Sequence, residues 1–350
     1  MEAYREETRS RALTQIDDVV KELPAFMRRF ANEYLVVKNK SPRTVLGYVT
    51  DIRIFLRFIA DYKDIRIKDI SYDILESITV DDMQDYFSYL LKYETHDETT
   101  GKKAVFENDV AARARKLSSV RALYNYLIVH DHLSKNVAAL VSVPKPDDRA
   151  VTYLENDEVR DVLHGAETGD SLTPAEYRIS KNQKYRDIAI LTLLLNTGLR
   201  VSEMVGIDLS DIDWKMKKIG VYRKGAKEQF IYFNDAVYEA LRDYLEYERK
   251  ADSADNDALF ISRKNQRLTV RSVERIVKKY TRSVVPSKKI TPHKLRSTFA
   301  TALYGNEESG VGGDIYIVAD ALGHSGLETV KKYTNVSDER RKKAASAIEY

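Results

Sequence analysis

Two prolines near the middle of the chain constrain its architecture more than any other feature. Pro144 and Pro146 lie in a polar run, residues 143–148. Each proline removes a backbone N–H donor and prevents a helix from continuing. We therefore expect a stiff linker over residues 143–150. The chain has 350 residues, which is enough for a buried core on each side of that linker.

Helical periodicity dominates the residues before the linker. Ser41 and Pro42 are typical of a helix start, and apolar residues then recur about every 3.6 positions as far as Ile59. Residues 1–22 are highly charged and predict an amphipathic leader. Further helices are expected over residues 23–40, 81–91 and 109–130, and a polar loop is expected over residues 93–101.

The residues after the linker combine helices with strands. Residues 212–233 alternate apolar and polar side chains, which predicts strands joined by a tight turn at residues 224–227. Residues 165–182 form a polar insertion that the pattern does not assign. Helices are expected over residues 155–164, 185–196, 235–250 and 272–280. The expected fold class is therefore α+β, mainly α-helical with a small antiparallel β-sheet.

Positive charge is concentrated in residues 261–296. The whole chain has a net charge of only +3, but this segment contains twelve basic residues and a single acid, Glu274. A charge run is usually a solvated surface, but one so one-sided favours a polyanionic partner such as nucleic acid. The basic residues are Arg263, Lys264, Arg267, Arg271, Arg275, Lys278, Lys279, Arg282, Lys288, Lys289, Lys294 and Arg296.

Basic side chains also lie on the helices expected before the linker. Helices with basic faces fit a small bundle that binds DNA. The residues that we expect to contact DNA across the chain are Arg43, Arg53, Arg113, Arg115, Lys116, Arg121, Lys227, Arg263, Lys264, Arg271 and Lys294.

The composition excludes several classes of site. The chain has no cysteine, which excludes disulfides and thiolate metal sites, and only six histidines are available as metal ligands. The longest apolar run, residues 188–195, is far shorter than the roughly 20 residues of a membrane span. The first residues lack the basic start and apolar core of a signal peptide. We expect a cytoplasmic protein that binds no cofactor, no metal and no membrane.

Four side chains suited to phosphate chemistry fall within residues 291–333. His293 and Arg296 are three positions apart on an expected helix, so both project from one face. His324 follows a Leu-Gly pair, and Tyr333 comes later in the same stretch. Each residue alone has an ordinary structural explanation, because most histidines and tyrosines are not catalytic. Their significance depends on the rest of the chain.

Two further pieces complete the set. Residues 197–203, Thr-Gly-Leu-Arg-Val-Ser-Glu, contain Arg200 and Glu203, and Lys224 lies in the expected hairpin turn. Together with His-x-x-Arg, Leu-Gly-His and the tyrosine, they resemble the active-site set of the tyrosine recombinases, the phage-integrase and Xer family. The order and spacing match that family over residues 150–335. The Ser-Pro-Arg-Thr run that begins at Ser41 also resembles the family's N-terminal core-binding domain.

The resemblance implies a domain order and an activity. A helical core-binding domain would span residues 23–142 and a catalytic domain residues 151–335, followed by a tail, residues 336–350, that packs on a neighbouring protomer. The enzyme would cut and rejoin DNA at specific sites through a 3′-phosphotyrosyl intermediate, without metal or ATP. Its partner would be double-stranded DNA at the nucleoid, with a homotetramer assembled on two sites. Integration, excision and chromosome-dimer resolution stay open, as does the use of accessory proteins.

The resemblance also implies a role for each residue, and the chemistry supports it. Phosphoryl transfer depends mostly on positioning and charge stabilisation. Arginine forks bind phosphate oxygens in pairs, so Arg200 and Arg296 would clamp the scissile phosphate. The remaining roles are Tyr333 as nucleophile, His293 as its base, His324 as a further donor to the phosphate, Lys224 as acid for the leaving 5′ oxygen, and Glu203 as support for Arg200.

Three alternatives stay open at the level of sequence. A type IB topoisomerase uses a similar arginine, lysine and tyrosine set to relax DNA as a monomer. A catalytically silent DNA-binding protein would keep the fold and form no covalent adduct. A metal-dependent nuclease would be inhibited by a chelator.

Overall fold

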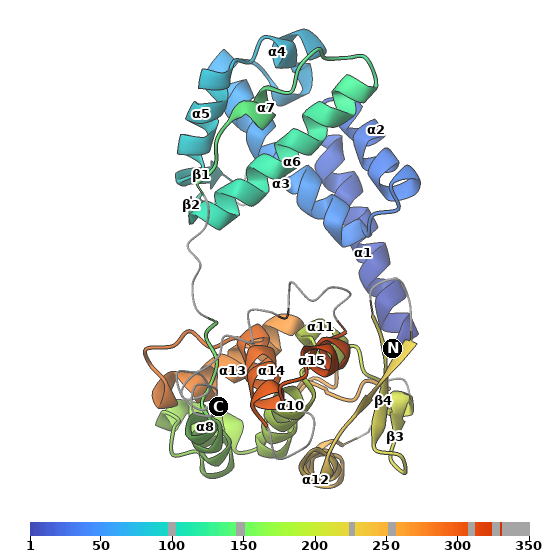
Figure 1. Cartoon of the computed structure of the whole chain (residues 1–350), viewed down its shortest axis with the longest axis vertical. Coiled ribbons are helices and arrows are strands. Elements are labelled where there is room, and N and C mark those ends of the chain that lie inside the picture. Colours follow the sequence, from blue (N-terminus) through green and yellow to red (C-terminus); the bar gives the residue numbers. More distant parts are fainter. Residues whose placement is uncertain are drawn as a thin grey trace, which may run out of the picture. The chain divides into compact units, whose positions relative to one another are not determined.

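The chain divides into two units, Glu2–Asp148 and Arg149–Tyr350. The computed structural model describes residues 1–96, 103–144, 151–223, 228–250, 257–306, 312–323 and residue 330. Each unit is mainly helical and contains a small antiparallel sheet (Figure 1), which confirms the expected fold class. No helix in the described ranges is long and apolar enough to cross a bilayer.

The first unit is built around α3 (Pro42–Lys63) and α6 (Val110–Val129), which pack against each other (Figure 1). As the sequence predicts, Ser41 caps α3, and its hydroxyl accepts a hydrogen bond from the Thr44 N–H at 3.2 Å. The other elements are α1 (Glu2–Lys21), α2 (Phe26–Asn32), a π-helix (Glu33–Val37), a 3₁₀ turn (Ile67–Asp69), α4 (Tyr72–Glu76), α5 (Val80–Tyr89), β1 (Lys92–His96), β2 (Lys103–Glu107) and α7 (Val137–Leu140).

The core of the first unit is rich in aromatic side chains. Phe55 of α3 makes edge contacts with Tyr86 and Tyr124, at ring-centroid distances of 5.1 and 6.3 Å. The Tyr124 hydroxyl donates to the Leu75 carbonyl at 3.1 Å, so its polar end is satisfied. The first helix also contributes, because α1 packs along α3 and buries Ile16 among other residues.

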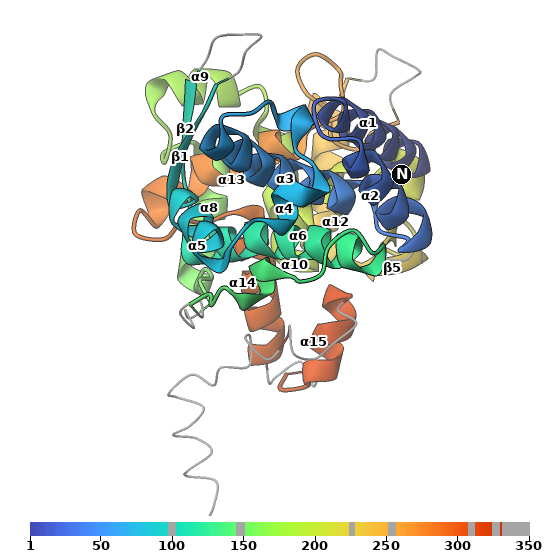
Figure 2. The ribbon, with the colours of Figure 1, turned by 90° about the horizontal axis from the view of Figure 1, so that it is seen from above.

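A two-stranded ribbon follows α5 (Figure 2). The sequence predicted a loop over residues 93–101, but residues 93–96 belong to β1, which pairs antiparallel with β2. That part of the loop prediction is wrong. Tyr93 lies opposite Phe106, and their rings stack at 5.3 Å. All side chains of β2 are exposed, so this strand has no buried face to produce a regular apolar alternation.

The second unit is organised around α10 (Lys184–Thr197), most of whose side chains are buried. It packs against α8 (Asn156–Thr168), α12 (Asp235–Asp243), α13 (Val270–Val284) and α14 (Pro292–Gly305). The remaining helical elements are α9 (Pro174–Ser180), α11 (Val201–Val205), a 3₁₀ turn (Leu209–Asp211), a π-helix (Tyr244–Glu248) and α15 (Ile315–Leu322).

A three-stranded antiparallel sheet lies in the same unit. Its order is β3 (Ile212–Asp213), β4 (Lys218–Tyr222) and β5 (Glu228–Tyr232), which confirms the strands predicted over residues 212–233. The insertion that the sequence left unassigned, residues 165–182, contains the end of α8 and the short helix α9. Thr173 begins α9 with a reciprocal cap. Its hydroxyl oxygen accepts from the Glu176 N–H at 3.4 Å, and the Glu176 carboxylate accepts from the Thr173 N–H at 3.2 Å.

Candidate active site

A glycine turn places Arg200 directly after α10. Gly198 follows the last residue of the helix with φ of +60°, a conformation that favours glycine. A Cβ at Gly198 would also lie 2.3 Å from Cδ1 of Phe299 on α14. The turn therefore packs closely onto the helix that contains His293 and Arg296.

Arg200 is held by Glu203 and remains partly open to solvent. The Arg200 N–H donates to Oε2 of Glu203 at 2.9 Å, and Nη1 of its guanidinium donates to Oε1 at 2.8 Å. The side chain of Glu203 is buried, whereas that of Arg200 is 40% exposed. Glu203 therefore orients a guanidinium that remains accessible to a ligand, and the role predicted for this pair stays a prediction.

Arg296 has a different environment, since it is only 1% exposed. Its Nη1 donates to the Gly198 carbonyl at 2.5 Å, and its Nη2 donates to the Leu322 carbonyl. One guanidinium thus joins the turn before Arg200 to the end of α15. The Thr-Gly-Leu-Arg segment, the His-x-x-Arg segment and the Leu322–Gly323 pair that precedes His324 are therefore brought together in the structure.

The other predicted catalytic residues divide into two groups. His293 is exposed near the start of α14, on the helix that also contains Arg296. Lys224, His324 and Tyr333 lie outside the described residues, as does the predicted DNA contact Lys227. Their roles stay predictions.

Arg223, which the sequence analysis did not select, is a buried neighbour of this site. Its side chain is 6% exposed and its Nε lies 3.8 Å from Oε1 of Glu203. Burial lowers the pKa of the Arg223 guanidinium, Glu203 opposes that change, and the charge of Arg200 adds to it. The only signal in the sequence is its position immediately before Lys224.

The basic residues predicted to bind DNA in the first unit are not equivalent. Arg43 is exposed and Arg53 is partly buried beside Glu22. Arg115 pairs with the buried Asp51, although more than half of its side chain is exposed. The other three contact the protein itself. The Arg113 guanidinium lies over the Phe87 ring at 4.6 Å, Lys116 donates to Asn108 at 2.7 Å, and Arg121 donates to the Ala138 and Val141 carbonyls at 2.9 and 2.8 Å.

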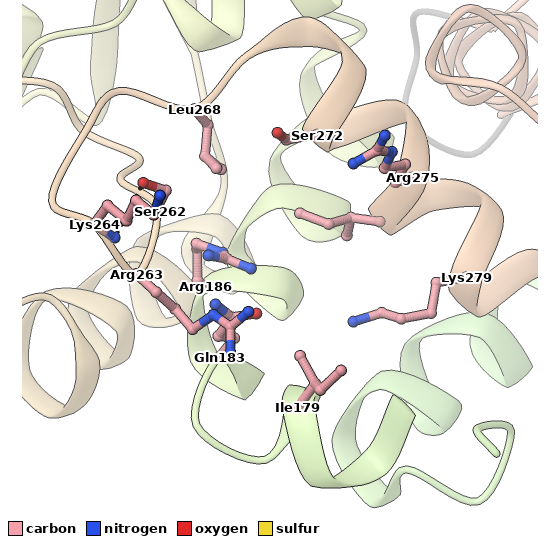
Figure 3. A pocket seen from close by; sticks show the side chains of 11 residues that line it. Ile179, Gln183, Arg186, Ser262, Arg263, Lys264, Leu268, Ser272, Arg275 and Lys279 are labelled. Carbon is pink, nitrogen blue, oxygen red and sulfur yellow. Dashed lines mark hydrogen bonds between the residues drawn. The ribbon is translucent and has the colours of Figure 1, made fainter. Parts of the chain in front are cut away.

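The basic segment of the second unit lines a pocket of about 550 Å³. Figure 3 shows its cationic side chains converging from the start of α10, the loop before α13 and α13 itself. Arg263, Lys264 and Arg275 have no carboxylate partner among the described residues, whereas Lys279 and Arg186 pair with the buried Asp187. Apolar side chains of Ile179, Leu268 and Ile276 complete the lining. Arg275 and Lys279 belong to the basic segment but were not among the predicted DNA contacts.

Two other predicted contacts lie outside this pocket lining. Arg271 is exposed on α13 and Lys294 is partly buried on α14. Across the described ranges, no group of three histidine or acidic side chains is placed to hold a metal ion.

Comparison with known proteins identifies the family. Residues 152–340 match the phage integrase family, and residues 27–130 match the phage integrase N-terminal SAM-like domain. The tyrosine recombinase XerC of Caldanaerobacter subterraneus subsp. tengcongensis is 34% identical over 337 residues, which cover 92% of this chain and 86% of that protein. The chain belongs to the tyrosine recombinase family. XerC of Leptospira interrogans serogroup Icterohaemorrhagiae serovar copenhageni is 31% identical and covers 90% of each chain.

Solved tyrosine recombinases share the fold. XerH site-specific recombinase bound to palindromic difH, a post-cleavage complex, has a TM-score of 0.62 at 19% identity and covers 88% of this chain and 81% of that one. A lambda integrase dimer bound to a COC′ core site has a TM-score of 0.59 at 17% identity, with coverage of 89% and 94%. Site-specific recombination is accordingly the activity of this tyrosine recombinase, and the topoisomerase alternative is not favoured.

Proposed function

We propose that this recombinase cleaves DNA by attack of the Tyr333 hydroxyl on a phosphodiester. The bond between phosphorus and the 5′ oxygen breaks, and a 3′-phosphotyrosine and a free 5′-hydroxyl form. The tyrosine proton passes to His293, and Lys224 supplies a proton to the leaving oxygen. Because one phosphodiester replaces another, the reverse attack by a new 5′-hydroxyl rejoins a strand without ATP.

One observation supports this proposal above the others. Arg200 and Arg296, far apart in the sequence, are brought together because Arg296 donates to the carbonyl of Gly198, two residues before Arg200. An accessible guanidinium held at this place suits a phosphate whose transition state concentrates negative charge on its non-bridging oxygens. Arg200 supplies the solvent-accessible guanidinium. Arg296 holds the surrounding segments in register.

The test is a covalent adduct in the presence of EDTA. Wild-type protein is mixed with a nicked suicide substrate taken from its own genomic neighbourhood, and the adduct is detected as a band that survives SDS. We expect Tyr333→Phe to form none. Tyr247→Phe, which alters an exposed tyrosine elsewhere in the same unit, should react like wild type. Salt-sensitive DNA binding with no adduct from wild type would instead support a silent DNA-binding protein.

We further propose that the basic pocket of Figure 3 contacts the DNA backbone through Arg263, Lys264 and Arg275. These side chains are exposed and lack carboxylate partners in the described ranges, so their charge is available to phosphates. Replacing all three with alanine should weaken binding and lower the slope of log affinity against log salt by about 0.9 for each phosphate that is no longer neutralised. Lys215→Ala, at an exposed position outside this pocket, is the control. An unchanged salt slope in the triple variant would contradict the assignment.

Exchange of four strands requires four nucleophiles, so the proposed active assembly is a homotetramer on two DNA sites at the nucleoid. The tail, residues 336–350, is proposed to pack on a neighbouring protomer and so to link assembly to cleavage. Deletion of residues 338–350 should abolish tetramers on DNA while leaving binding to a single site. Tetramers that persist after the deletion would refute this role.

A further inference from the structure

We propose that Arg223 is a positioning residue that fixes three parts of the active site relative to one another. These parts are the end of α15 before His324, the Arg200–Glu203 pair, and the chain entering Lys224. The inference rests on the proposed function, since it assigns a role within the same site. Arg223 directly precedes Lys224 in the sequence, and its guanidinium is buried.

The first set of contacts reaches the end of α15. Nη2 of Arg223 donates to the Ala321 carbonyl at 3.0 Å, and Nη1 donates to the Asp320 carbonyl at 3.4 Å. Arg296 donates to the next carbonyl, that of Leu322. The last carbonyls of a helix have no partner within the helix. The Asp320 carbonyl also accepts from the Gly323 N–H at 2.7 Å, whereas the Ala321 and Leu322 carbonyls take their donors from two arginines of separate segments. These contacts fix the point from which the chain continues to His324.

Gly323 shows how closely Arg223 approaches. A Cβ at Gly323 would lie 1.7 Å from Nη1 of Arg223, and the glycine has φ of +59°. Any other residue would meet both the guanidinium and an unfavourable backbone conformation. The glycine of the Leu-Gly-His motif therefore makes room for a side chain from the β4 segment, as well as ending α15.

The second contact reaches Glu203. Oε1 of Glu203 accepts from Nη1 of Arg200 at 2.8 Å and lies 3.8 Å from Nε of Arg223. At that distance the second contact is an ion pair without a hydrogen bond, and Nε has no hydrogen-bond partner within the described ranges. The carboxylate therefore lies between two guanidiniums. Arg223 holds Glu203 in place, and Glu203 in turn orients Arg200.

Arg249 provides a control that distinguishes a positioning role of Arg223 from a purely structural one. Arg249 is also a buried arginine of the second unit, and it donates to the backbone carbonyls of Ala258 and Leu259. Neither carbonyl belongs to a predicted catalytic segment. Arg223→Met and Arg249→Met remove the same group from two comparable environments. Both variants should lower the thermal unfolding midpoint, but only Arg223→Met should lower the rate of DNA cleavage.

The experiment measures single-turnover cleavage of the suicide substrate at saturating protein, together with the Kd for the same DNA. We expect Arg223→Met to lower the cleavage rate by about 100-fold with little change in Kd, since misplacement of reacting groups costs rate more than binding. Arg223→Lys should not restore the rate, because one ammonium cannot reach two carbonyls and a carboxylate. Arg249→Met should cleave at the wild-type rate. Equal rates for the two methionine variants, or a loss explained by Kd alone, would overturn the proposal.

A second measurement tests the contact without any catalysis. Gly323→Ala should lower the unfolding midpoint strongly in wild type, because the added methyl meets Arg223. In the Arg223→Met background, Gly323→Ala should lower the unfolding midpoint clearly less, because only the backbone strain at residue 323 remains. An additive double variant would show that the predicted contact does not form, whatever the chemistry of Tyr333. If the wild-type protein forms no covalent adduct, the proposed function fails. The double-mutant cycle of unfolding midpoints would still show whether Arg223 contacts Gly323.

Discussion

The two units bury charge very differently. In the described ranges the first unit buries two charged side chains, Asp51 and Lys116, around a core of aromatic and aliphatic residues. The second unit buries seven: Arg186, Asp187, Glu203, Asp208, Arg223, Arg249 and Arg296. A buried charge is costly unless well-placed partners compensate for it. The first unit is thus stabilised mainly by apolar packing, whereas the second maintains buried charges that join distant segments.

The two kinds of interaction constrain the positions of neighbouring segments to different degrees. Apolar contacts are not directional, so a core such as that of the first unit tolerates small shifts. Hydrogen-bonded arginines impose distances and angles, as Arg296 does between Gly198 and Leu322. A site that must hold a phosphate benefits from the second kind of interaction. Matched substitutions in the two units would show whether the buried charges of the second unit act in this way.

The largest expected effect distinguishes Arg200, which is proposed to bind the phosphate, from Arg296, which joins the segments around it. Arg200→Ala should lower cleavage by roughly 10²–10³-fold, the usual loss for a donor to developing negative charge. Its stability should fall less than that of Arg296→Ala, because the buried Glu203 keeps the backbone N–H of residue 200 and its ion pair with Arg223. Arg296→Ala should lower both cleavage and stability, the latter by roughly 2–6 kcal/mol, because two buried carbonyls lose their donors.

Suicide-substrate cleavage and urea unfolding measure the two quantities for both variants. Equal losses of stability in Arg200→Ala and Arg296→Ala would show that burial does not distinguish these arginines.

The next effect concerns the buried Asp187. Its carboxylate accepts from Arg186 at 2.8 Å, from Lys279 at 2.6 Å and from the Tyr280 hydroxyl at 3.2 Å. Asp187→Ala would leave buried cations without a counter-charge, so we expect a loss of about 3–5 kcal/mol in urea unfolding. The matched variant in the first unit is Asp51→Ala. Its partner Arg115 is more than half exposed and can turn to solvent, so the loss should be smaller. The reverse order would contradict the comparison.

Local signals in the sequence predicted the framework well. The cap formed by Ser41 and Pro42, the strands over residues 212–233 and the helix begun by Pro292 all rest on short-range backbone chemistry. The spacing of Arg200 and Glu203 likewise predicted their pairing, which forms at the start of α11 between the N-cap residue and the third residue of the helix. Features determined within one or two turns are therefore visible in the sequence.

Features that depend on distant segments were not predictable. The strand at residues 92–96 was missed because its partner strand is wholly exposed and gives no buried face. Lys116 was placed on a basic face, but its ammonium meets Asn108, on the segment before α6. Arg223 was missed because its partners, the end of α15 and Glu203, are separated from it in the sequence. Periodicity describes one element and carries no information about which other element approaches it.

A smaller difference in stability is expected between substitutions of two buried tyrosines. Tyr280 donates to the Asp187 carboxylate, whereas Tyr124 donates to a neutral carbonyl, that of Leu75. Hydrogen bonds to charged groups contribute more than those between neutral groups. Tyr280→Phe should therefore cost about 1.5–3 kcal/mol and Tyr124→Phe about 1 kcal/mol in urea unfolding. Equal costs would mean that the Asp187 network is no stronger than an ordinary core hydrogen bond.

The smallest effect depends on pH. Glu248 accepts from the Arg186 N–H at 3.2 Å, and burial raises the pKa of its carboxyl from 4.5 to about 7, with the nearby charge of Asp187 acting in the same direction. The folded state therefore binds this proton more tightly than the unfolded state, so its contribution to stability falls as pH rises from 4.5 to about 7. In the first unit, hydrogen bonding from the Thr79 N–H lowers the pKa of the Asp82 carboxyl. The pH dependence is therefore opposite to that of Glu248, because the stability that Asp82 contributes is lost as pH falls.

Glu248→Gln keeps an acceptor for the Arg186 N–H and removes the titration. At pH 8 the variant should be more stable than wild type by on the order of 1 kcal/mol, after allowance for solvent screening, and the difference should vanish near pH 4.5. Hydrogen exchange of peptides from α10, compared with peptides from α5 of the first unit, localises the change to one unit. A pH dependence in α10 that survives the substitution would assign the titration to another group. A shift in α5 as well would show that the two units do not respond independently to their buried charges.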